Sequence, residues 1–353
     1  MDFARSVTHP VTHSVIHRAC GGSVRGVTAA TDLVGIDEIR AAAGRIARYA
    51  VRTPLLAPPL GDRRAGLYLK PEVLQPMGAF KIRGAVNAVA ALDPEVRARG
   101  VVAHSSGNHA QAVAFAARAF GIAAHIVIPD NAPTRKVEAT RAYGATVDLV
   151  PVAERVTRAE QVARETGMTM IPPFDDRDVI AGQGTIGLEI AEDAANLDVP
   201  VAAVLVPVSG GGLISGIAAA LAALAPEVAV IGVEPELAGD AAESFRAGRR
   251  IAWRAEDTGR TCADGLRVPC VGELPWAHIR SYVRDIITVT EDEILAATRA
   301  LALDARIVAE PSGAASVAAH LFHGAELPAG ARVAVVSGGN VDPALLGRLL
   351  GGS

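Results

Sequence analysis

The sequence has few aromatic residues and no excess of positive charge. Aromatic residues make up 4% of the 353 positions, and the formal net charge is −4. Such a chain has no basic field with which to hold nucleic acid or an anionic membrane. Since half of the residues are hydrophobic, we expect a core built mainly from Ala, Val, Leu and Ile, with room for two domains.

Cysteine is scarce as well. Cys20, Cys262 and Cys270 are an odd number and lack the spacing of zinc ligands. A cytoplasmic protein with free thiols is the simplest account. Met1–Ala30 is polar and has no hydrophobic segment of the kind that a signal peptide needs. We expect residues 1–31 to form a flexible N-terminal tail.

One uncharged run is long enough to cross a bilayer, but its texture argues against a membrane. Val201–Leu224 contains no charged residue. It begins with the β-branched run Val201–Val206, continues through the glycines of Ser209–Gly212, and ends in an alanine-leucine run. The pattern predicts a buried strand, a glycine loop and a buried helix.

Short apolar strands and amphipathic helices alternate through most of the chain, which predicts an α/β fold with parallel sheets flanked by helices. The pair Pro172–Pro173 marks the expected return from a smaller inserted domain to a larger one. Arg249–His278 breaks the rhythm and is expected to be a long ordered connection. After Val336 we expect almost no further structure, hence no C-terminal regulatory domain.

Leu74–Asn87 reads LQPMGAFKIRGAVN, a glycine loop that leads into an expected helix, Ala79–Leu92. Lys81 lies in the first turn of this helix, between the apolar residues Phe80 and Ile82, with Arg83 close by. Partial desolvation and a neighbouring cation would lower the pKa of the amine, as a lysine that forms a Schiff base requires. The alternative is an ordinary exposed lysine at a helix start.

A second glycine loop lies in Val204–Gly216, VLVPVSGGGLISG. A strand, glycines and a helix start form an anion site in which a phosphate is the natural guest. The rival interpretation is a dinucleotide site, because Gly210, Gly212 and Gly216 are suitably spaced and Glu234 ends the next strand, where a ribose-binding acid would stand.

Two more loops follow expected strands. His104–Gln111 reads HSSGNHAQ and could hold a carboxylate; Ser337–Asn340 reads SGGN. A helix cap and a turn are the plainer interpretations. Parallel sheets bind ligands at the carboxyl ends of their strands, so the three loops are expected to face one crevice. Together with Lys81 they describe a site for pyridoxal phosphate and an amino acid.

Five motifs in this order, AFKIRGAVNAV, SSGNHAQAVA, VIAGQGTIGLEI, VPVSGGGLISGIA and VVSGGNVD, resemble the serine/threonine dehydratase and serine racemase family of fold-type II pyridoxal-phosphate enzymes, which are tryptophan synthase beta-like. The resemblance runs from about Asp32 to the C-terminus. It implies a large cofactor-binding domain, residues 32–99 and 178–353, with a small domain, residues 100–177, inserted in it.

The resemblance also implies roles for individual residues. Lys81 would form the Schiff base with the cofactor and later remove the substrate α-proton. Phe80 would pack beside the cofactor ring, Asn108 would bind its 3′-hydroxyl and Ser337 would meet its pyridine nitrogen. Backbone N–H groups of the glycine loop would bind the phosphate, those of Ser209, Gly210, Gly211, Gly212 and Leu213.

The substrate carboxylate would be held by the second loop, through Ser105, Ser106, Gly107, Asn108 and His109. In racemases of the family the serine at the position of Ser106 stands opposite the lysine and can protonate the other face. Ser106 therefore permits racemisation, while a helix-cap hydroxyl is the alternative.

Glu234, Ala238 and Asp240 match the divalent-cation site of the family, with Ala238 contributing its backbone carbonyl. Two carboxylates and a carbonyl are hard oxygen ligands suited to magnesium or calcium (Mg2+ or Ca2+). A solvated loop is the alternative interpretation.

The implied reaction is α,β-elimination of L-threonine or L-serine to a 2-oxo acid and ammonia, by a catabolic type of enzyme. A serine racemase, a 3-hydroxyaspartate or other β-hydroxy-amino-acid dehydratase, a nicotinamide-dependent dehydrogenase and a non-catalytic pyridoxal-phosphate-binding protein are the alternatives. Met77 and Ala79 depart from the threonine and serine common in the family, which leaves the substrate open. A cytoplasmic homodimer or tetramer is expected.

Overall fold

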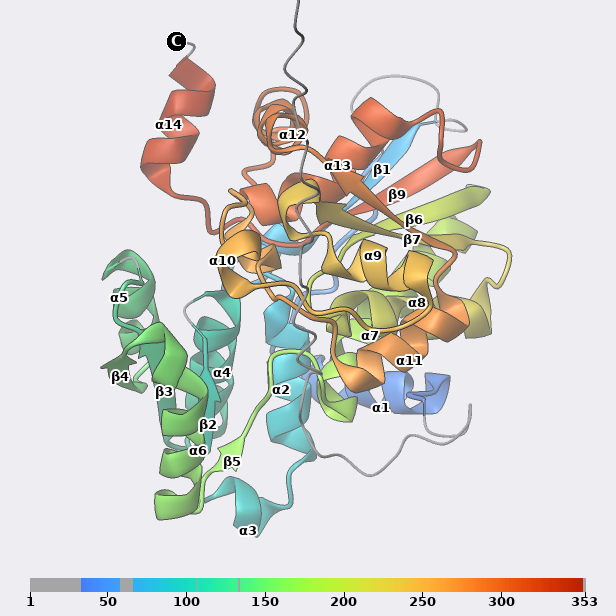
Figure 1. Ribbon diagram of the computed structural model, residues 1–353. Helices are drawn as coiled ribbons and strands as arrows, with labels where there is room; N and C mark the ends of the chain where they lie inside the picture. The colour runs from blue at the N-terminus through green and yellow to red at the C-terminus, as the bar shows by residue number, and fades with distance from the viewer. Residues whose placement is uncertain (1–32, 58–65, 106, 133, 352–353) are drawn as a thin grey trace, which may run out of the picture.

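The computed structural model describes residues 33–57, 66–105, 107–132 and 134–351. Two parallel sheets, each flanked by helices, form two units joined through helix α2 (Lys81–Ala91) (Figure 1). The predicted α/β class is thereby confirmed. The predicted tail, residues 1–31, lies outside the described residues.

The larger unit is built on a five-stranded sheet in the order β1-β9-β6-β7-β8, with every neighbouring pair parallel. Alternate side chains of its strands enter two different cores. Val204 and Val206 pack with one set of helices, whereas Ala203 and Leu205 pack with another. Helices therefore cover both faces, as expected for a fully buried parallel sheet. The strands are β1 (Leu67–Pro71), β6 (Val201–Pro207), β7 (Ala229–Pro235), β8 (Asp285–Val289) and β9 (Ala331–Val336).

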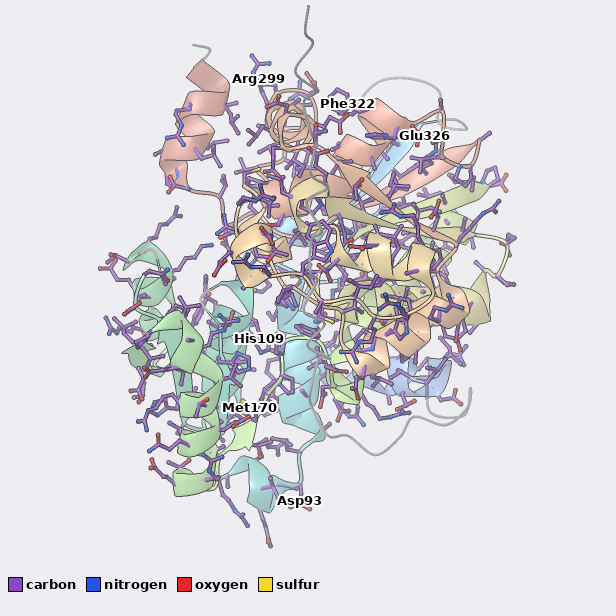
Figure 2. All side chains as sticks on the ribbon, in the orientation of Figure 1. Asp93, His109, Met170, Arg299, Phe322 and Glu326 are labelled. Atoms are coloured by element: carbon purple, nitrogen blue, oxygen red, sulfur yellow. The ribbon has the colours of Figure 1, made fainter. Side chains whose placement is uncertain are left out.

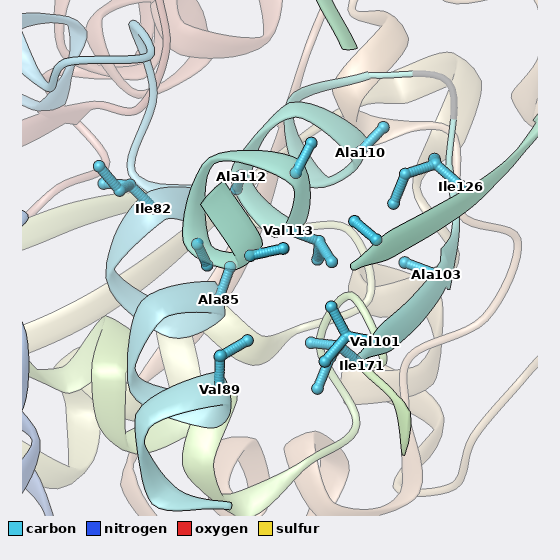
Figure 3. Close-up of a cluster of buried hydrophobic side chains, with 14 of the residues drawn as sticks. Ile82, Ala85, Val89, Val101, Ala103, Ala110, Ala112, Val113, Ile126 and Ile171 are labelled. Carbon is cyan, nitrogen blue, oxygen red and sulfur yellow. The ribbon is translucent and has the colours of Figure 1, made fainter. Parts of the chain in front are cut away.

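The smaller unit has a four-stranded parallel sheet in the order β4-β3-β2-β5. Helix α6 covers one face; α4 covers the other and packs against α2. Figure 3 shows Ile82 and Ala85 of α2 in the same apolar cluster as Val113 of α4. The elements are β2 (Val101–His104), α4 (Asn108–Phe120), β3 (Ala124–Pro129), α5 (Thr134–Ala142), β4 (Thr146–Val150), α6 (Arg155–Thr166) and β5 (Thr169–Met170).

The remaining helices belong to the larger unit or join the two. They are α1 (Ile36–Ile46), α3 (Pro94–Arg97), α7 (Arg177–Asn196), α8 (Gly212–Leu224), α9 (Asp240–Ala247), α10 (Ala255–Thr258), α11 (Glu273–Tyr282), α12 (Glu291–Leu303), α13 (Pro311–His323) and α14 (Pro343–Gly351), with short 3-10 turns η2 (Glu72–Leu74), η3 (Val152–Glu154), η4 (Glu236–Ala238) and η5 (Asp264–Leu266). The four-stranded sheet lies within the predicted small-domain range of residues 100–177, and the exact boundaries stay a prediction.

Two predictions about helices were wrong. The segment expected to be a connection, Arg249–His278, contains the start of α11. Its Pro275 lies in the first turn, where proline is tolerated, and the carboxylate of Asp175 accepts hydrogen bonds from the N–H groups of Glu273 and Leu274. After Val336 the chain forms α14, which packs against α12.

The uncharged run Val201–Leu224 folds as predicted, with β6 followed by a glycine loop and α8. In the part of the chain that the structure describes, no helix combines the length and the apolar character that crossing a bilayer requires. Cys262 and Cys270 are free thiols.

A buried ion network fixes the first turns of α2. Arg83, 1% exposed, donates to both carboxylate oxygens of Glu72 at 2.8 Å and to Glu189 at 2.6 Å. Lys70 donates to Glu189 at 2.6 Å and to the carbonyl of Thr53. The network joins β1, η2, α2 and α7, so it sets the position of the helix that begins with Lys81.

Replacing Arg83 by Met should strongly destabilise the fold, because Glu72 and Glu189 would keep their buried charges without this partner. We expect a loss of about 3 to 5 kcal/mol in the free energy of unfolding, measured by denaturant titration. Arg52→Met is the matched control, since Arg52 forms exposed ion pairs with Glu192 and Asp193, worth about 1 kcal/mol or less. Equal losses in the two variants would contradict the role given to the network.

Candidate functional site

Lys81 begins α2, and its amine is desolvated without a charged partner. Nζ donates to the carbonyl oxygen of Pro173 at 2.6 Å and lies 5.1 Å from the centre of the Phe80 ring. Burial lowers the pKa of Lys81 to about 8. Arg83 was expected to contribute to this shift, and that expectation is wrong, because its charge is taken up by Glu72 and Glu189.

The other lysines of the chain have carboxylate partners. The sequence contains three lysines, Lys70, Lys81 and Lys136. Lys70 pairs with Glu189, and Lys136 pairs with Asp264. Among the three, Lys81 is thus the one whose amine can become neutral without leaving a carboxylate behind, which is the property that a reactive amine requires.

The loop before Lys81 pairs with the loop after β9 through the backbone. Phe80 N–H donates to the carbonyl of Ser337 at 3.0 Å, and Gly339 N–H donates to the carbonyl of Gly78 at 2.8 Å. Gly78 has φ +77°, a conformation that a side chain would strain. This pairing brings Lys81 and Ser337 to the same end of the sheet. The side chain of Ser337 is buried and makes one long contact, 3.5 Å to the carbonyl of Ser312.

The glycine loop between β6 and α8 leaves room for an anion. The first N–H groups of α8 have no acceptor within the helix, and Gly211 precedes it with φ +90°. A Cβ at Gly210 would lie 2.3 Å from the ring of Phe174. The side chain of Ser209 accepts a hydrogen bond from the N–H of Val268 at 3.3 Å, so a neighbouring segment holds the loop.

Asn108 opens α4 and is held from two sides. Its Nδ2 donates to Glu310 at 2.6 Å, and its Oδ1 accepts from Nδ2 of Asn340 at 2.8 Å. Asn340 also donates to the carbonyl of Met77. The three predicted loops thus meet around Lys81 and Asn108. Glu310 was missed by sequence reasoning, because a glutamate before Pro311 has the pattern of an ordinary helix start.

The other residues predicted to bind the substrate carboxylate have mixed placements. The side chain of His109 is buried, and its Nε2 donates to the carbonyl of Ile171 at 2.9 Å. Burial, with a contribution from the charge of Lys81, lowers the pKa of His109 to about 3. The imidazole is therefore neutral and engaged, which corrects the expectation that it offers a free donor. Figure 2 labels His109 in the unit built on the four-stranded sheet.

Ser105 and Gly107 form a small turn, in which Oγ of Ser105 accepts from the N–H of Gly107 at 3.2 Å. Ser106, predicted to act in catalysis and in carboxylate binding, lies outside the described residues. Met77 and Ala79, where a substrate preference was expected, are buried in the apolar cluster that α2 shares with the smaller unit. Neither side chain offers appreciable surface to a substrate.

A family model described as "Pyridoxal-phosphate dependent enzyme" matches residues 46–339. The chain belongs to this family. Its cofactor is therefore pyridoxal phosphate, as predicted. This leaves no role for the dinucleotide interpretation of Gly210, Gly212 and Gly216, which is wrong.

Individual members of the family resemble the chain over most of its length. It is 42% identical to "L-threo-3-hydroxyaspartate ammonia-lyase" of Saccharomyces cerevisiae over 88% of this chain and 94% of that protein. It is 41% identical to "Serine racemase" of Oryza sativa subsp. indica, over 88% and 92%. It is 42% identical to "L-threonine ammonia-lyase" of Thermotoga maritima, over 90% and 78%.

Solved structures agree. A bacterial threonine deaminase, from the source abbreviated T.th., superposes with a TM-score of 0.81 at 43% identity, covering 87% of this chain and 99% of that one. Maize serine racemase also gives 0.81, at 40% identity, with 89% and 95% covered. The predicted fold-type II architecture is confirmed.

The residues present fit pyridoxal phosphate. Lys81 offers an amine of lowered pKa, the start of α8 offers free N–H groups, and Asn108 and Ser337 offer uncharged polar groups. The chemistry of this donor set matches an aldehyde, a phosphate and the polar atoms of a pyridine ring.

Glu234 and Asp240 form a second polar cluster, remote in sequence from these loops. Glu234 is fully buried and accepts from the N–H groups of Ala241 and Ala242 at 3.3 and 2.8 Å. Both carboxylate oxygens of Asp240 are buried without a hydrogen-bond partner. Burial raises the pKa of both groups, that of Asp240 to about 8. Within the described residues, no group of three or more His, Cys, Asp or Glu side chains could hold a metal, so a cation here would also need backbone or water oxygens.

Gly210→Ala should weaken cofactor binding, because the added Cβ would push Phe174 and the phosphate loop apart. We expect the dissociation constant for pyridoxal phosphate to rise at least about tenfold, measured by fluorescence titration. Gly44→Ala is the matched control, since nothing lies within 4 Å of a Cβ at that helical position. Unchanged affinity in Gly210→Ala would contradict the assignment of the loop.

Proposed function

We propose that this protein is a pyridoxal-phosphate-dependent ammonia-lyase that eliminates water from a β-hydroxy amino acid and releases a 2-oxo acid and ammonia, with L-threonine and L-serine as the first candidate substrates. The observation that carries the proposal is Lys81, an amine of lowered pKa at the meeting point of three loops in a chain of this family. The names of the relatives support the reaction class, since several are ammonia-lyases or dehydratases.

The neutral amine of Lys81 can take a proton from the α-carbon of the substrate. With its ordinary pKa of 10.5, only about one amine in three thousand would be neutral at pH 7, whereas a pKa of about 8 leaves about one in ten. Bound pyridoxal phosphate supplies the electron sink for negative charge at that carbon. The carbonyl of Pro173 accepts a hydrogen bond from Lys81 and orients the amine.

The loop before α4 is the proposed site for the substrate carboxylate. The free N–H groups of a helix start attract anions, and Asn108 and His109 occupy the first positions of α4. Since the imidazole of His109 is engaged with Ile171, its backbone is the part that can bind. Ser105 and Gly107 shape the turn, and Ser106 stays a predicted contributor.

A hydroxyl partner for the pyridine nitrogen favours elimination. Ser337 carries no charge and cannot stabilise a positive charge on the ring nitrogen as a carboxylate would. A weaker electron sink suits a reaction in which negative charge at the α-carbon is short-lived and a β-substituent departs at once.

Serine racemase is the second candidate, because relatives from Oryza sativa and Arabidopsis thaliana carry that name at 41% and 42% identity. A 3-hydroxyaspartate dehydratase is a third, on the name of the yeast relative. A racemase would incorporate solvent deuterium at the α-carbon of recovered serine and yield both enantiomers; a dehydratase would release ammonia instead.

Lys81→Ala and Lys81→Arg should both lose activity by at least about a thousandfold, because neither side chain can act as a neutral base near pH 7. The measurement is ammonia release from a panel of L-threonine, L-serine and the 3-hydroxyaspartate isomers. Melting curves control for folding. Turnover of any panel member by Lys81→Ala at the wild-type rate would refute the mechanism, and failure of the wild type on all members would favour a non-catalytic binding protein.

We also propose that Glu234 and Asp240, with the backbone carbonyl of Ala238, bind Mg2+ or Ca2+. Two buried carboxylates with no cation nearby are costly, and the unpartnered oxygens of Asp240 fit a hard cation. The homo-oligomeric state and the cytoplasmic location expected from the sequence stay predictions.

The cation should stabilise the protein more at pH 8 than at pH 6. Without metal, the pKa of Asp240 rises from 3.8 to about 8 on folding, so stability falls as the pH rises from about 4 to 8. A cation bound by the ionised pair reverses this loss, by about 2.7 kcal/mol at a hundredfold excess over its dissociation constant. Melting curves with and without magnesium or calcium measure the effect.

Asp240→Asn should abolish the response to the cation, because it removes one of the two ligand charges. Asp292→Asn, at an exposed position of α12, is the control and should keep the response. A wild-type melting temperature that neither cation changes at either pH would disprove the site.

A further inference from the structure

The orientation of the Asn108 amide is dictated by a chain of hydrogen bonds that starts at a backbone carbonyl. The carbonyl of Met77 can only accept, so the group that Asn340 turns toward it must be Nδ2. The same Nδ2 donates to Asn108, which must therefore present Oδ1. Nδ2 of Asn108 is left on the other side, where it meets Glu310 at 2.6 Å.

Glu310 occupies a site that allows it little movement. It is 3% exposed and lies just before Pro311 and helix α13. Its backbone N–H donates to the carbonyl of Gly338 at 3.0 Å. A Cβ at Gly338 would lie 2.2 Å from Oε1 of Glu310. The carboxylate is thus packed against the loop that carries Ser337 and points at Asn108.

We propose that Glu310 is a positioning residue for the cofactor: its carboxylate takes one hydrogen of the Asn108 amide and leaves the second to donate to the ring hydroxyl of pyridoxal phosphate. This inference rests on the proposed function, because it assumes the contact between Asn108 and the cofactor. Asn340 and Glu310 act as a pair, one fixing the oxygen of the amide and the other its nitrogen.

Ionisation of Glu310 makes this arrangement sensitive to pH. Three groups face the carboxyl from different elements: Asn108 of α4, Asp264 of η5 and Lys136 of α5. Burial, reinforced by the charge of Asp264, raises the pKa of Glu310 to about 7, against the opposing effects of Asn108 and Lys136. Below that pH, the charge-assisted hydrogen bond to Asn108 becomes a neutral one of about half the strength.

The test is the absorption spectrum of the cofactor-loaded protein, titrated from about pH 5.5 to 8.5 in the wild type and in Glu310→Gln. The amide oxygen of a glutamine can still accept from Asn108, but it does not ionise near pH 7. We expect a change in the visible band of the wild type centred near pH 7, absent from Glu310→Gln, with cofactor affinity kept within about threefold. Glu310→Leu, which removes the acceptor, should weaken cofactor affinity about tenfold.

Glu227→Gln makes the same chemical change at an exposed position and should titrate like the wild type. Superimposable titrations of the wild type and Glu310→Gln would overturn the inference and leave the proposed function standing. A wild type that develops no visible band with pyridoxal phosphate would overturn both. Because the readout is a spectrum, a merely structural role of Glu310 would not produce the expected difference.

Discussion

Two backbone hydrogen bonds, Phe80 to Ser337 and Gly339 to Gly78, hold the site together. They join the loop that follows β1 to the loop that follows β9, and these strands are parallel neighbours in the sheet. Because both strands end at the same edge, their loops emerge side by side. The pairing places Lys81 near Ser337 and brings Asn340 within reach of Met77 and Asn108. The rest of the site is built on this contact.

The chemistry then depends on which buried charges have partners. Lys70 and Lys81 are both removed from water, and burial lowers the pKa of each. Lys70 faces Glu189, whose charge opposes the shift, so it serves as a structural cation. Lys81 faces a carbonyl and an aromatic ring, which cannot offset the loss of hydration. The same residue type thus has two uses, decided by a carboxylate.

Much of this was predictable from the sequence. The alternation of apolar runs predicted β6, α8 and the other parallel elements, and the glycine loops with Lys81 and Asn108 could be recognised because each is a local pattern. The cofactor and the fold type followed from the order of these patterns. What could not be predicted depends on partners far apart in the chain: Asp175 capping α11, Ile171 engaging His109 and Glu310 holding Asn108. The neutralisation of Arg83 by Glu72 and Glu189 belongs to the same class.

The most direct test of the central claim, that Lys81 is the reactive amine, uses the small number of lysines in the chain. The cofactor-loaded protein is reduced with borohydride, digested, and its peptides are mapped by mass spectrometry. We predict that the mass of the reduced cofactor is attached to the peptide that contains Lys81, with none on Lys70 or Lys136. Attachment to either of those lysines, or to no lysine in a protein that has bound the cofactor, would contradict the account.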